Sequence, residues 1–232
     1  MKKIGIIGAM ELEVETLKSR MDIKNIVKKA AMEFYEGTLD GTEAVIVRSG
    51  IGKVNAGICV QILCDLFGVT HMINTGVAGS LDAKINIGDI VISTDALYHD
   101  MDATIFGYQP GEVPQMGQRE FTADPKLIEL AKTSCQTVSP DVGVFTGRIV
   151  SGDQFVSDKA VKQRICDLFG GLCTEMEGCA IAHASTLNDI PFVIIRAISD
   201  KADDSAHIDY PAFEKKAAQD CAEITAYMVK HI

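Results

Sequence analysis

Three carboxylates, Glu13, Glu177 and Asp200, each follow a short segment that is strand-like or rich in apolar and small residues. In an open α/β sheet, side chains at the ends of such segments are the ones presented to a ligand. The three acids lie far apart in the sequence, so only a fold that gathers several strand ends could bring them together. No metal-binding spacing of histidines accompanies them. The pattern predicts acid–base chemistry on a bond whose leaving group must be protonated.

Helical spacing distinguishes Glu13 from the other glutamates around it. Glu13 shares an apolar stripe with Met10, Val14 and Leu17, whereas Glu11 lies on the solvated face. A carboxylate on the apolar stripe needs a partner or a function, because burying an unpaired charge is costly. The nearby helix N-terminus favours the ionised form. The pattern alone also allows a purely structural role, in which Glu13 complements the helix dipole.

A second pair of acids flanks Met176. If residues 173–176 are extended, Glu175 and Glu177 point the same way and Met176 points to the opposite side. A methionine between two acids gives an apolar surface beside hydrogen-bond acceptors, which suits a ribose whose hydroxyls donate. Complementation of a helix dipole is again the structural alternative for each acid.

Asp200 closes the apolar segment that begins at Phe192. The carboxyl end of a buried strand is a ligand-binding position in open α/β sheets, although Asp200 could instead be a helix N-cap or a turn residue. Arg196 interrupts the same segment. A buried arginine needs a partner, so we expect it to contact a nearby carboxylate, with Glu175 as the candidate.

Strand-like and helix-like segments alternate along the chain. Strands are expected at residues 3–8, 43–49, 70–75, 89–94, 144–150 and 192–198, and helices at 11–20, 53–67, 125–136, 158–168, 177–188 and 211–230. Several strands are apolar on both faces, as in a sheet covered by helices on both sides. The pattern predicts one α/β domain over residues 1–232, a three-layer αβα unit with a central mixed, largely parallel sheet.

Two kinds of segment fall outside this alternation. Residues 100–121 are rich in aromatic residues, proline and glycine without periodicity, which is typical of a lid or a subunit contact; a disordered surface insertion is the alternative. The glycines of 49–54 lack the spacing of a phosphate loop. Those of 74–79 would let backbone amides approach a sugar or an anion, unless they only form a tight turn.

Composition narrows the class of protein. The chain has 232 residues, 47% of them hydrophobic, and a net charge of −10, which disfavours nonspecific nucleic-acid binding and a phosphate site. Its seven cysteines show no metal-ligand or CxxC spacing, which fits a reducing cytoplasm. No segment approaches the ~20 apolar residues that span a membrane. A cytoplasmic protein without a metal or cofactor is expected.

The segments taken in order resemble the 5′-methylthioadenosine/S-adenosylhomocysteine nucleosidase family, within the purine nucleoside phosphorylase-like superfamily. The resemblance covers essentially the whole chain. It rests on IGIIGAMELEVE, SGIGKVNAG, INTGVAGSL, GDIVIS, YHDMDATIFGY, IVSGDQFV, TEMEGCAIAH and FVIIRAISDKAD. Two residues depart from the family pattern: Val77 stands where a serine is common, and Ser80 where a glycine is frequent. These departures bear on substrate preference.

The resemblance implies hydrolysis of the N-glycosidic bond of methylthioadenosine and adenosylhomocysteine, and also of 5′-deoxyadenosine, to adenine and a ribose product. Asp200 would protonate adenine N7, Glu13 would activate water, and Glu177 would bind the ribose. The bond breaks through an oxocarbenium-like transition state, and adenine must be protonated to leave. Asp200 must therefore be neutral near pH 7, which places its pKa about three units above the ordinary value. The substrate-binding residues implied are Met10, Ile51, Val77, Gly79, Phe155, Val156, Glu175, Met176, Ser199 and Tyr210.

The resemblance also implies a homodimer in which residues 100–121 complete the neighbouring site through Phe106, Tyr108 and Pro114. Two other functions are compatible with the fold. A phosphorylase would need arginines near the attacking group, whereas the chain places Glu13 after the first strand and no arginine in residues 74–80. A non-catalytic nucleoside-binding protein would bind without releasing adenine. The sequence does not rank the possible adenine nucleosides, including futalosine-type substrates.

Overall fold

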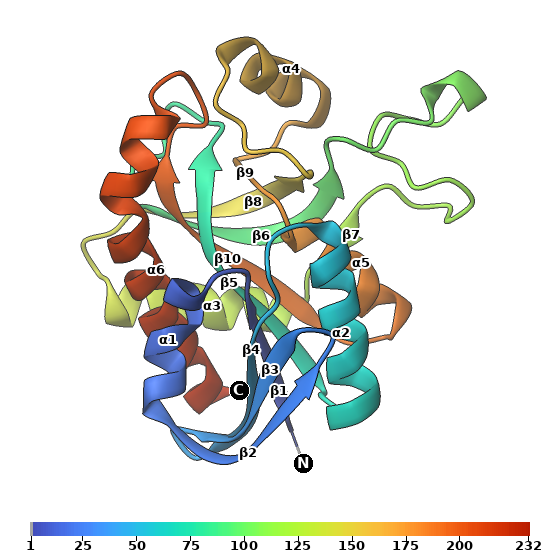
Figure 1. Ribbon diagram of the computed structural model, residues 1–232. Helices are drawn as coiled ribbons and strands as arrows, with labels where there is room; N and C mark the ends of the chain where they lie inside the picture. Colours follow the sequence, from blue (N-terminus) through green and yellow to red (C-terminus); the bar gives the residue numbers. More distant parts are fainter. Residues whose placement is uncertain (1) are drawn as a thin grey trace.

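A mixed β-sheet runs through the computed structural model, which describes residues 2–232 (Figure 1). Its strands are β1 (Ile4–Gly8), β2 (Met21–Lys29), β3 (Met32–Leu39), β4 (Thr42–Arg48), β5 (His71–Ser80), β6 (Ile90–Tyr98), β7 (Phe121–Thr122), β8 (Val144–Ser151), β9 (Cys173–Glu175) and β10 (Phe192–Asp200). The helices are α1 (Glu11–Arg20), α2 (Lys53–Phe67), α3 (Pro125–Val138), α4 (Lys159–Phe169), α5 (Gly178–Leu187), α6 (Ala206–His231) and a short 3-10 helix, η1 (Thr104–Phe106).

Five strands close into a ring. β5 pairs with β10, β10 with β6, β6 with β8, β8 with β9, and β9 again with β5. Register shifts in β6 and β10 mark bulges, which bend the strands and allow the sheet to curl. The closure brings the carboxyl ends of β5, β9 and β10 together.

Parallel and antiparallel pairings are equally frequent among the described strands. Five are parallel, β1–β4, β1–β5, β5–β10, β6–β8 and β8–β9, and five are antiparallel, β2–β3, β3–β4, β5–β9, β6–β7 and β6–β10. The expected mixed sheet is confirmed. Parallel pairs do not predominate as the sequence predicts. The hairpins of β2, β3 and β4 add two antiparallel pairs at one edge, and β5–β9, β6–β7 and β6–β10 add three elsewhere in the sheet.

Helices flank both faces of the sheet (Figure 1). On one face α2 and α5 bury side chains such as Val60, Leu63 and Ile181. On the other, α1, α3 and α6 bury a second cluster that includes Leu17 and Ile224. The bounds of α1 and α2 match the prediction residue for residue. Helix α6 begins at Ala206, earlier than the predicted residue 211, and so contains Pro211 in its second turn.

The hairpin of β2 and β3 was not predicted. β2 is an edge strand whose residues are mostly exposed, so it lacks the apolar pattern of a buried strand. Its two-residue turn consists of Ala30 and Ala31 with φ of 48° and 60°. Such turns require positive φ at both positions and are usually marked by Asn-Gly or Asp-Gly. Two alanines give no such signal in the sequence.

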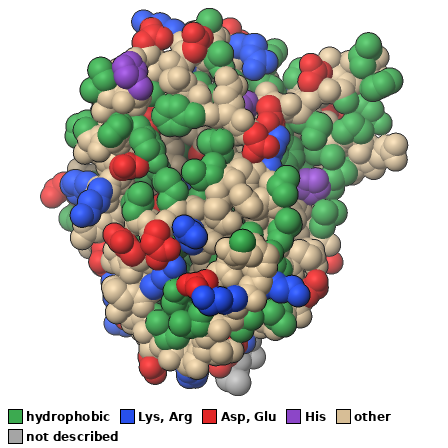
Figure 2. All heavy atoms as spheres, viewed as in Figure 1, with side chains coloured by type: hydrophobic (Ala, Val, Ile, Leu, Met, Phe, Trp, Pro, Cys, Tyr) green, Lys and Arg blue, Asp and Glu red, His purple; other side chains and the backbone are tan. Residues whose placement is uncertain are grey.

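Much of residues 100–121, which we call the arm, projects from the body of the protein (Figure 1), whereas Phe121 at its end is buried in β7. Hydrophobic side chains cover much of the arm surface (Figure 2). Ile105 and Phe106 near its tip are 88% and 80% exposed. No helix in residues 2–232 combines the length and the apolar character needed to cross a bilayer.

Candidate active site

A cavity of about 360 Å3 opens where β1 meets α1 and where β5, β9 and β10 end. It is lined by Ala9, Met10, Glu13, Ile51, Val77, Ala78, Gly79, Phe155, Thr174, Glu175, Met176, Glu177, Ser199, Asp200 and Tyr210. Its volume is in the range of small-molecule sites. The fold therefore brings Glu13, Glu177 and Asp200 together in one cavity.

Glu13 lies in the first turn of α1 and is 3% exposed. Its Oε2 accepts hydrogen bonds from the N–H groups of Ala9 (2.6 Å) and Met10 (2.9 Å), and its Oε1 accepts one from Val77 (3.1 Å). Burial raises the pKa of the Glu13 carboxyl, while Arg196 and the three N–H donors oppose that increase. The carboxyl thus combines fixed geometry with a proton affinity above its ordinary value.

The glycines of β5 make room for these acids. A Cβ at Gly76 would overlap Glu13 Oε1, and a Cβ at Gly79 would lie 2.7 Å from Asp200 Oδ1. The sequence predicts that this segment lets backbone amides approach an anion. In the structure the segment is a strand, and the anion at the Val77 N–H is the protein's own Glu13.

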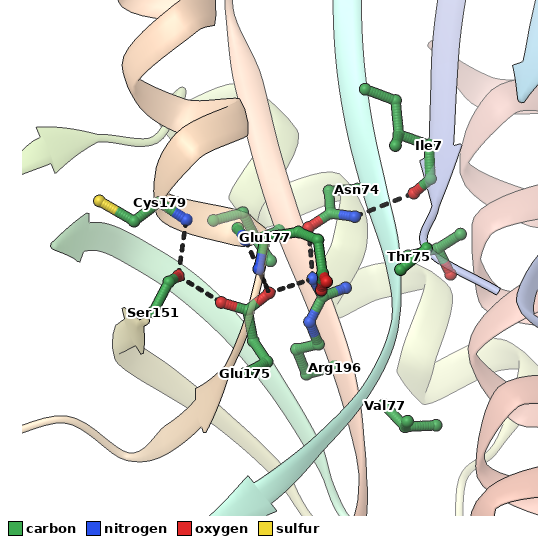
Figure 3. A network of polar contacts seen from close by, with 12 residues as sticks. Ile7, Asn74, Thr75, Val77, Ser151, Glu175, Glu177, Cys179 and Arg196 are labelled. Atoms are coloured by element: carbon green, nitrogen blue, oxygen red, sulfur yellow. Dashed lines mark hydrogen bonds and ion pairs between the residues drawn. The ribbon is translucent and has the colours of Figure 1, made fainter. Parts of the chain in front are cut away.

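Glu175 forms the centre of a buried polar network (Figure 3). Its Oε2 pairs with Arg196 Nη2 at 2.5 Å, so the expected Arg196–Glu175 contact is present. The same oxygen accepts from the N–H groups of Glu177 (3.1 Å) and Gly178 (2.7 Å), while Oε1 accepts from the Ser151 hydroxyl. Burial alone would raise the pKa of Glu175, but Arg196 and these donors lower it below the ordinary value.

These contacts cap the N-terminus of α5, so Glu175 does complement a helix dipole. Ser151 extends the cap by accepting from the Cys179 N–H at 2.7 Å. Although Glu175 lines the cavity, protein donors already occupy both of its oxygens.

Glu177 is 6% exposed and precedes the first residue of α5. Its Oε1 accepts from the N–H of Gly52 at 2.7 Å. Burial raises the pKa of Glu177 to about 8, and the negative charge of Glu175 adds to this increase. The Gly52 N–H and Arg196 act in the opposite direction.

Asp200 ends β10 and is 2% exposed. Its Oδ1 accepts from the Ala202 N–H at 2.8 Å, and the Ser199 hydroxyl lies 2.9 Å from Oδ2. Burial raises the pKa of Asp200, with the Ala202 and Ser199 hydrogen bonds opposing it. This environment favours the protonated form, as a general acid requires.

Apolar side chains form the remaining walls. The Tyr210 hydroxyl lies 3.3 Å from Met10 Sδ, and the Tyr210 ring packs edge-on against Phe155 with centroids 5.6 Å apart. Val156 lines a smaller chamber of about 30 Å3 beside the main cavity, together with Phe155 and Asp200. Ile51, at the start of α2, closes another side.

Phe106, Tyr108 and Pro114 do not line the cavity of their own chain. They lie in the arm, which projects away from the body of the protein (Figure 1).

Sequence reasoning missed Asn74, whose Oδ1 accepts from Arg196 Nη2 while its Nδ2 donates to the Ile7 carbonyl at 2.9 Å (Figure 3). It also missed Ser151, for which the polar residue that ends an apolar strand was the available signal. Asn74 lies inside β5 and not at its end.

The chemistry of the lining residues limits what the cavity can hold. Among the described residues, no lysine or arginine lines it. Within residues 2–232, no group of three His, Cys, Asp or Glu side chains is arranged to hold a metal ion. The cavity offers carboxyl groups, apolar surface and the hydroxyl-bearing residues Thr174, Ser199 and Tyr210 to a ligand.

Comparisons with known proteins find similar sequences over nearly the whole chain. The model of the phosphorylase superfamily matches residues 3–230. The 5′-methylthioadenosine/S-adenosylhomocysteine nucleosidase of Halalkalibacterium halodurans is 44% identical over 230 residues, which cover 99% of this chain and 98% of that protein.

Solved structures give the same result. The nucleosidase of that name from Neisseria meningitidis, in complex with methylthio-immucillin-A, superposes with a TM-score of 0.96 at 41% identity, covering 100% of both chains. The Colwellia psychrerythraea enzyme in complex with adenine gives 0.94 at 38% identity, covering 98% of this chain and 94% of that one. The chain belongs to the phosphorylase superfamily and, within it, to the 5′-methylthioadenosine/S-adenosylhomocysteine nucleosidases.

Proposed function

We propose that this protein hydrolyses the N-glycosidic bond of 5′-methylthioadenosine and S-adenosylhomocysteine, and also that of 5′-deoxyadenosine. The products are adenine and the corresponding 5-substituted ribose. One observation carries the proposal: Glu13, Glu177 and Asp200, from three different elements, surround one cavity whose lining contains no basic side chain. Membership of the nucleosidase family supports it.

In this proposal Asp200 is the general acid. Adenine is a poor leaving group unless its N7 is protonated. The acid must therefore carry a proton near neutral pH. Burial among apolar residues raises the pKa of Asp200 in the required direction. Phe155 and the backbone of Val156 hold adenine beside Asp200.

Glu13 is the base that orients and activates water on the other side of the sugar. Its oxygens are fixed by three backbone N–H groups, so the carboxylate need not reorganise during the reaction. Glu177 and Met176 hold the ribose, with Glu177 accepting from its hydroxyls. Glu175 supports Glu177 through their shared hydrogen bond, and Val77, Gly79 and Ser199 complete the wall beside the sugar and the base.

The 5′-thioalkyl group lies between Met10, Ile51 and Tyr210 in this proposal. We infer a homodimer in which Phe106, Tyr108 and Pro114 of the partner's arm close this end. Two features support the homodimer. One is the exposed arm, and the other is a second cavity of about 310 Å3 that is lined in part by Val54, Tyr98 and Leu187. Large exposed apolar surface of this kind is typical of protein contacts.

We also infer that residues 1–232 form one nucleosidase domain of three αβα layers, working in the cytoplasm without a cofactor. The family match over residues 3–230 and the helices on both faces of the sheet support the domain.

A phosphorylase reaction is the main alternative, because phosphorylases share the superfamily. Phosphate would enter a cavity lined by acids, where Arg196 is already paired with Glu175 and Asn74. Because no lysine or arginine of residues 2–232 lines the cavity, a buried phosphate would have no cation to pair with, which disfavours such a ligand.

The decisive experiment measures adenine release from methylthioadenosine, adenosylhomocysteine, 5′-deoxyadenosine and a futalosine-type nucleoside, each with and without phosphate. We expect phosphate-independent release and free ribose products. Formation of a ribose 1-phosphate would establish the phosphorylase instead. Tight nucleoside binding without adenine release would identify a binding protein.

A further inference from the structure

The N-terminus of α2 is capped from other parts of the chain. Its N-cap is Gly52, which has no side chain, and the first N–H groups of the helix need acceptors. Gly52 N–H donates to Glu177 Oε1 at 2.7 Å, and Lys53 N–H donates to Asp153 Oδ1 at 2.9 Å. Two carboxylates from separate segments therefore take the place of a local cap, and one of them is the proposed ribose ligand.

The side chain of Lys53 connects the same region to the base of the arm. Lys53 Nζ lies 2.5 Å from Asp100 Oδ2 and 3.7 Å from Asp153 Oδ2. Asp100 Oδ2 also accepts from the Asp153 N–H at 2.9 Å. Three segments, the start of α2, the base of the arm and the loop after β8, thus meet at one ammonium group.

This cluster differs from an isolated surface ion pair. The side chains of Lys53 and Asp100 are only 23% and 27% exposed, and Nζ also lies 5.4 Å from the centroid of the Tyr98 ring. Partial burial alone would raise the pKa of Asp100, but Lys53 and the Asp153 N–H lower it below the ordinary value. Several partners and partial burial make such a network stronger than an exposed pair.

The segment that the cluster fixes also needs an unusual backbone. Gly50 and Gly52 have φ of 85° and 97°, a region that disfavours other residues. A Cβ at Gly52 would lie 3.1 Å from Asp153 Oδ1. The position of the Gly52 N–H therefore depends on both the glycine conformation and the contacts of Lys53 with Asp153 and Asp100.

We propose that Lys53 is a positioning residue for ribose binding, because its ion pairs with Asp100 and Asp153 hold the Gly52 N–H against Glu177. The inference rests on the proposed function, and it couples the base of the arm to the ribose-binding acid. Lys53 does not line the main cavity, so it acts through Gly52 and Glu177.

A change at Lys53 should also alter the pH dependence of kcat/KM. The charged groups that face Glu177 are Glu13 from α1, Glu175 from β9 and Arg196 from β10, and the Gly52 N–H faces it from α2. A change at Lys53 leaves the three charged groups in place and loosens only the Gly52 contact. Loss of that donor makes the carboxylate harder to form, so the acidic limb of kcat/KM moves to higher pH.

The test is steady-state adenine release by the full-length protein and by Lys53→Met over a range of pH. We expect KM for methylthioadenosine to rise about tenfold, since a hydrogen bond to a charged group is lost, with kcat changed less than about threefold. The acidic limb of kcat/KM should shift upward by about half a unit or more. Asp100→Asn should reproduce these changes, and Lys53→Arg should restore most of the wild-type KM.

Lys132→Met is the matched control. Lys132 is also paired with a carboxylate, Glu129 at 2.9 Å, but it lies on α3 and lines no part of the cavity. Its variant should keep the wild-type KM and pH profile. Sedimentation of every variant shows whether assembly has changed.

Two results would overturn the inference while adenine release by the wild type still supports the proposed function. One is a wild-type KM and pH profile in Lys53→Met. The other is a KM increase that accompanies only loss of assembly or of thermal stability, without a shift of the acidic limb. Absence of adenine release by the wild type would overturn the proposed function itself, and this inference with it.

Discussion

At the scale of single residues, three buried carboxyl groups differ because their partners differ. Glu13 accepts three backbone N–H bonds, Glu175 pairs with Arg196, and Asp200 has one N–H and one hydroxyl partner. Burial acts on all three, and the number and charge of the donors decide how far each pKa departs from its ordinary value. The same chemical group can therefore differ in proton affinity within one cavity according to its partners.

Removing either proposed catalytic group should abolish most turnover without unfolding the protein. Asp200→Asn cannot donate the N7 proton, and Glu13→Gln cannot accept a proton from water. Each change should lower kcat by about 10²–10⁴-fold in an adenine-release assay.

The chain supplies matched controls for both changes. Glu11 and Asp204 are exposed neighbours of the two acids, so Glu11→Gln and Asp204→Asn should retain wild-type rates. Circular dichroism of all four variants should show the wild-type fold. Wild-type turnover in Asp200→Asn or Glu13→Gln would contradict the assigned roles.

The raised pKa of Glu177 predicts a pH-dependent stability. With a pKa of about 8 in the folded protein against an ordinary 4.5, the folded state keeps a proton that the unfolded state loses. The free energy of unfolding therefore falls as pH rises from about 4.5 toward 8. Glu177→Gln removes this contribution, so the variant should gain stability relative to wild type as pH rises. Urea unfolding at both ends of this pH range measures the difference in free energy of unfolding between the variant and the wild type. A difference that stays constant with pH would contradict the prediction.

Local spacing predicted which residues are buried, but not all of their partners. The apolar stripe of α1 identified Glu13 because helix periodicity is a local property. The need of a buried arginine for a carboxylate led to Arg196 and Glu175. Asn74 and Ser151 escaped prediction because their partners come from elements that only the fold brings together. Asn74 contacts Arg196 of β10, and Ser151 contacts Glu175 of β9 and Cys179 of α5.

At the scale of elements, the predicted helices were more accurate than the predicted strands. α1 and α2 were predicted to the residue, since glycines precede both and apolar periodicity continues through them. β2 was missed because most of its residues are exposed, and the alanine turn between β2 and β3 gave no hairpin signal. β7 and β9 have two and three residues, too few to show a pattern.

The alanine turn between β2 and β3 should be open to improvement. Replacing Ala30-Ala31 by Asn-Gly fits the positive φ of both positions and relieves the steric cost of a left-handed conformation. We expect the free energy of unfolding to rise by about 1 kcal/mol. Urea denaturation measures it, and adenine release should not change, since neither alanine lines the cavity. A loss of stability would show that the two alanines make contacts that outweigh their strain.

At the scale of the whole molecule, the exposed arm predicts an assembly. Phe106→Glu places a charge on its apolar tip, so it should dissociate the proposed homodimer and raise KM by about tenfold, as the thioalkyl pocket loses its cover. Gln109→Glu adds the same charge to the same arm at an exposed polar position and should change neither property. Analytical ultracentrifugation and adenine release test both variants. A monomeric wild type of full activity would contradict the role of the arm.

The ring of five strands also sets an order of events during protein synthesis. β10 pairs with both β5 and β6, yet it follows both of them in the sequence and is made after them. While a ribosome is still translating the first 190 residues or so, β5 and β6 keep unpaired edges, and the cavity has neither Asp200 nor its closing strand. The nascent chain therefore cannot complete this cavity, and so cannot begin turnover, until β10 has been made and has paired with β5 and β6.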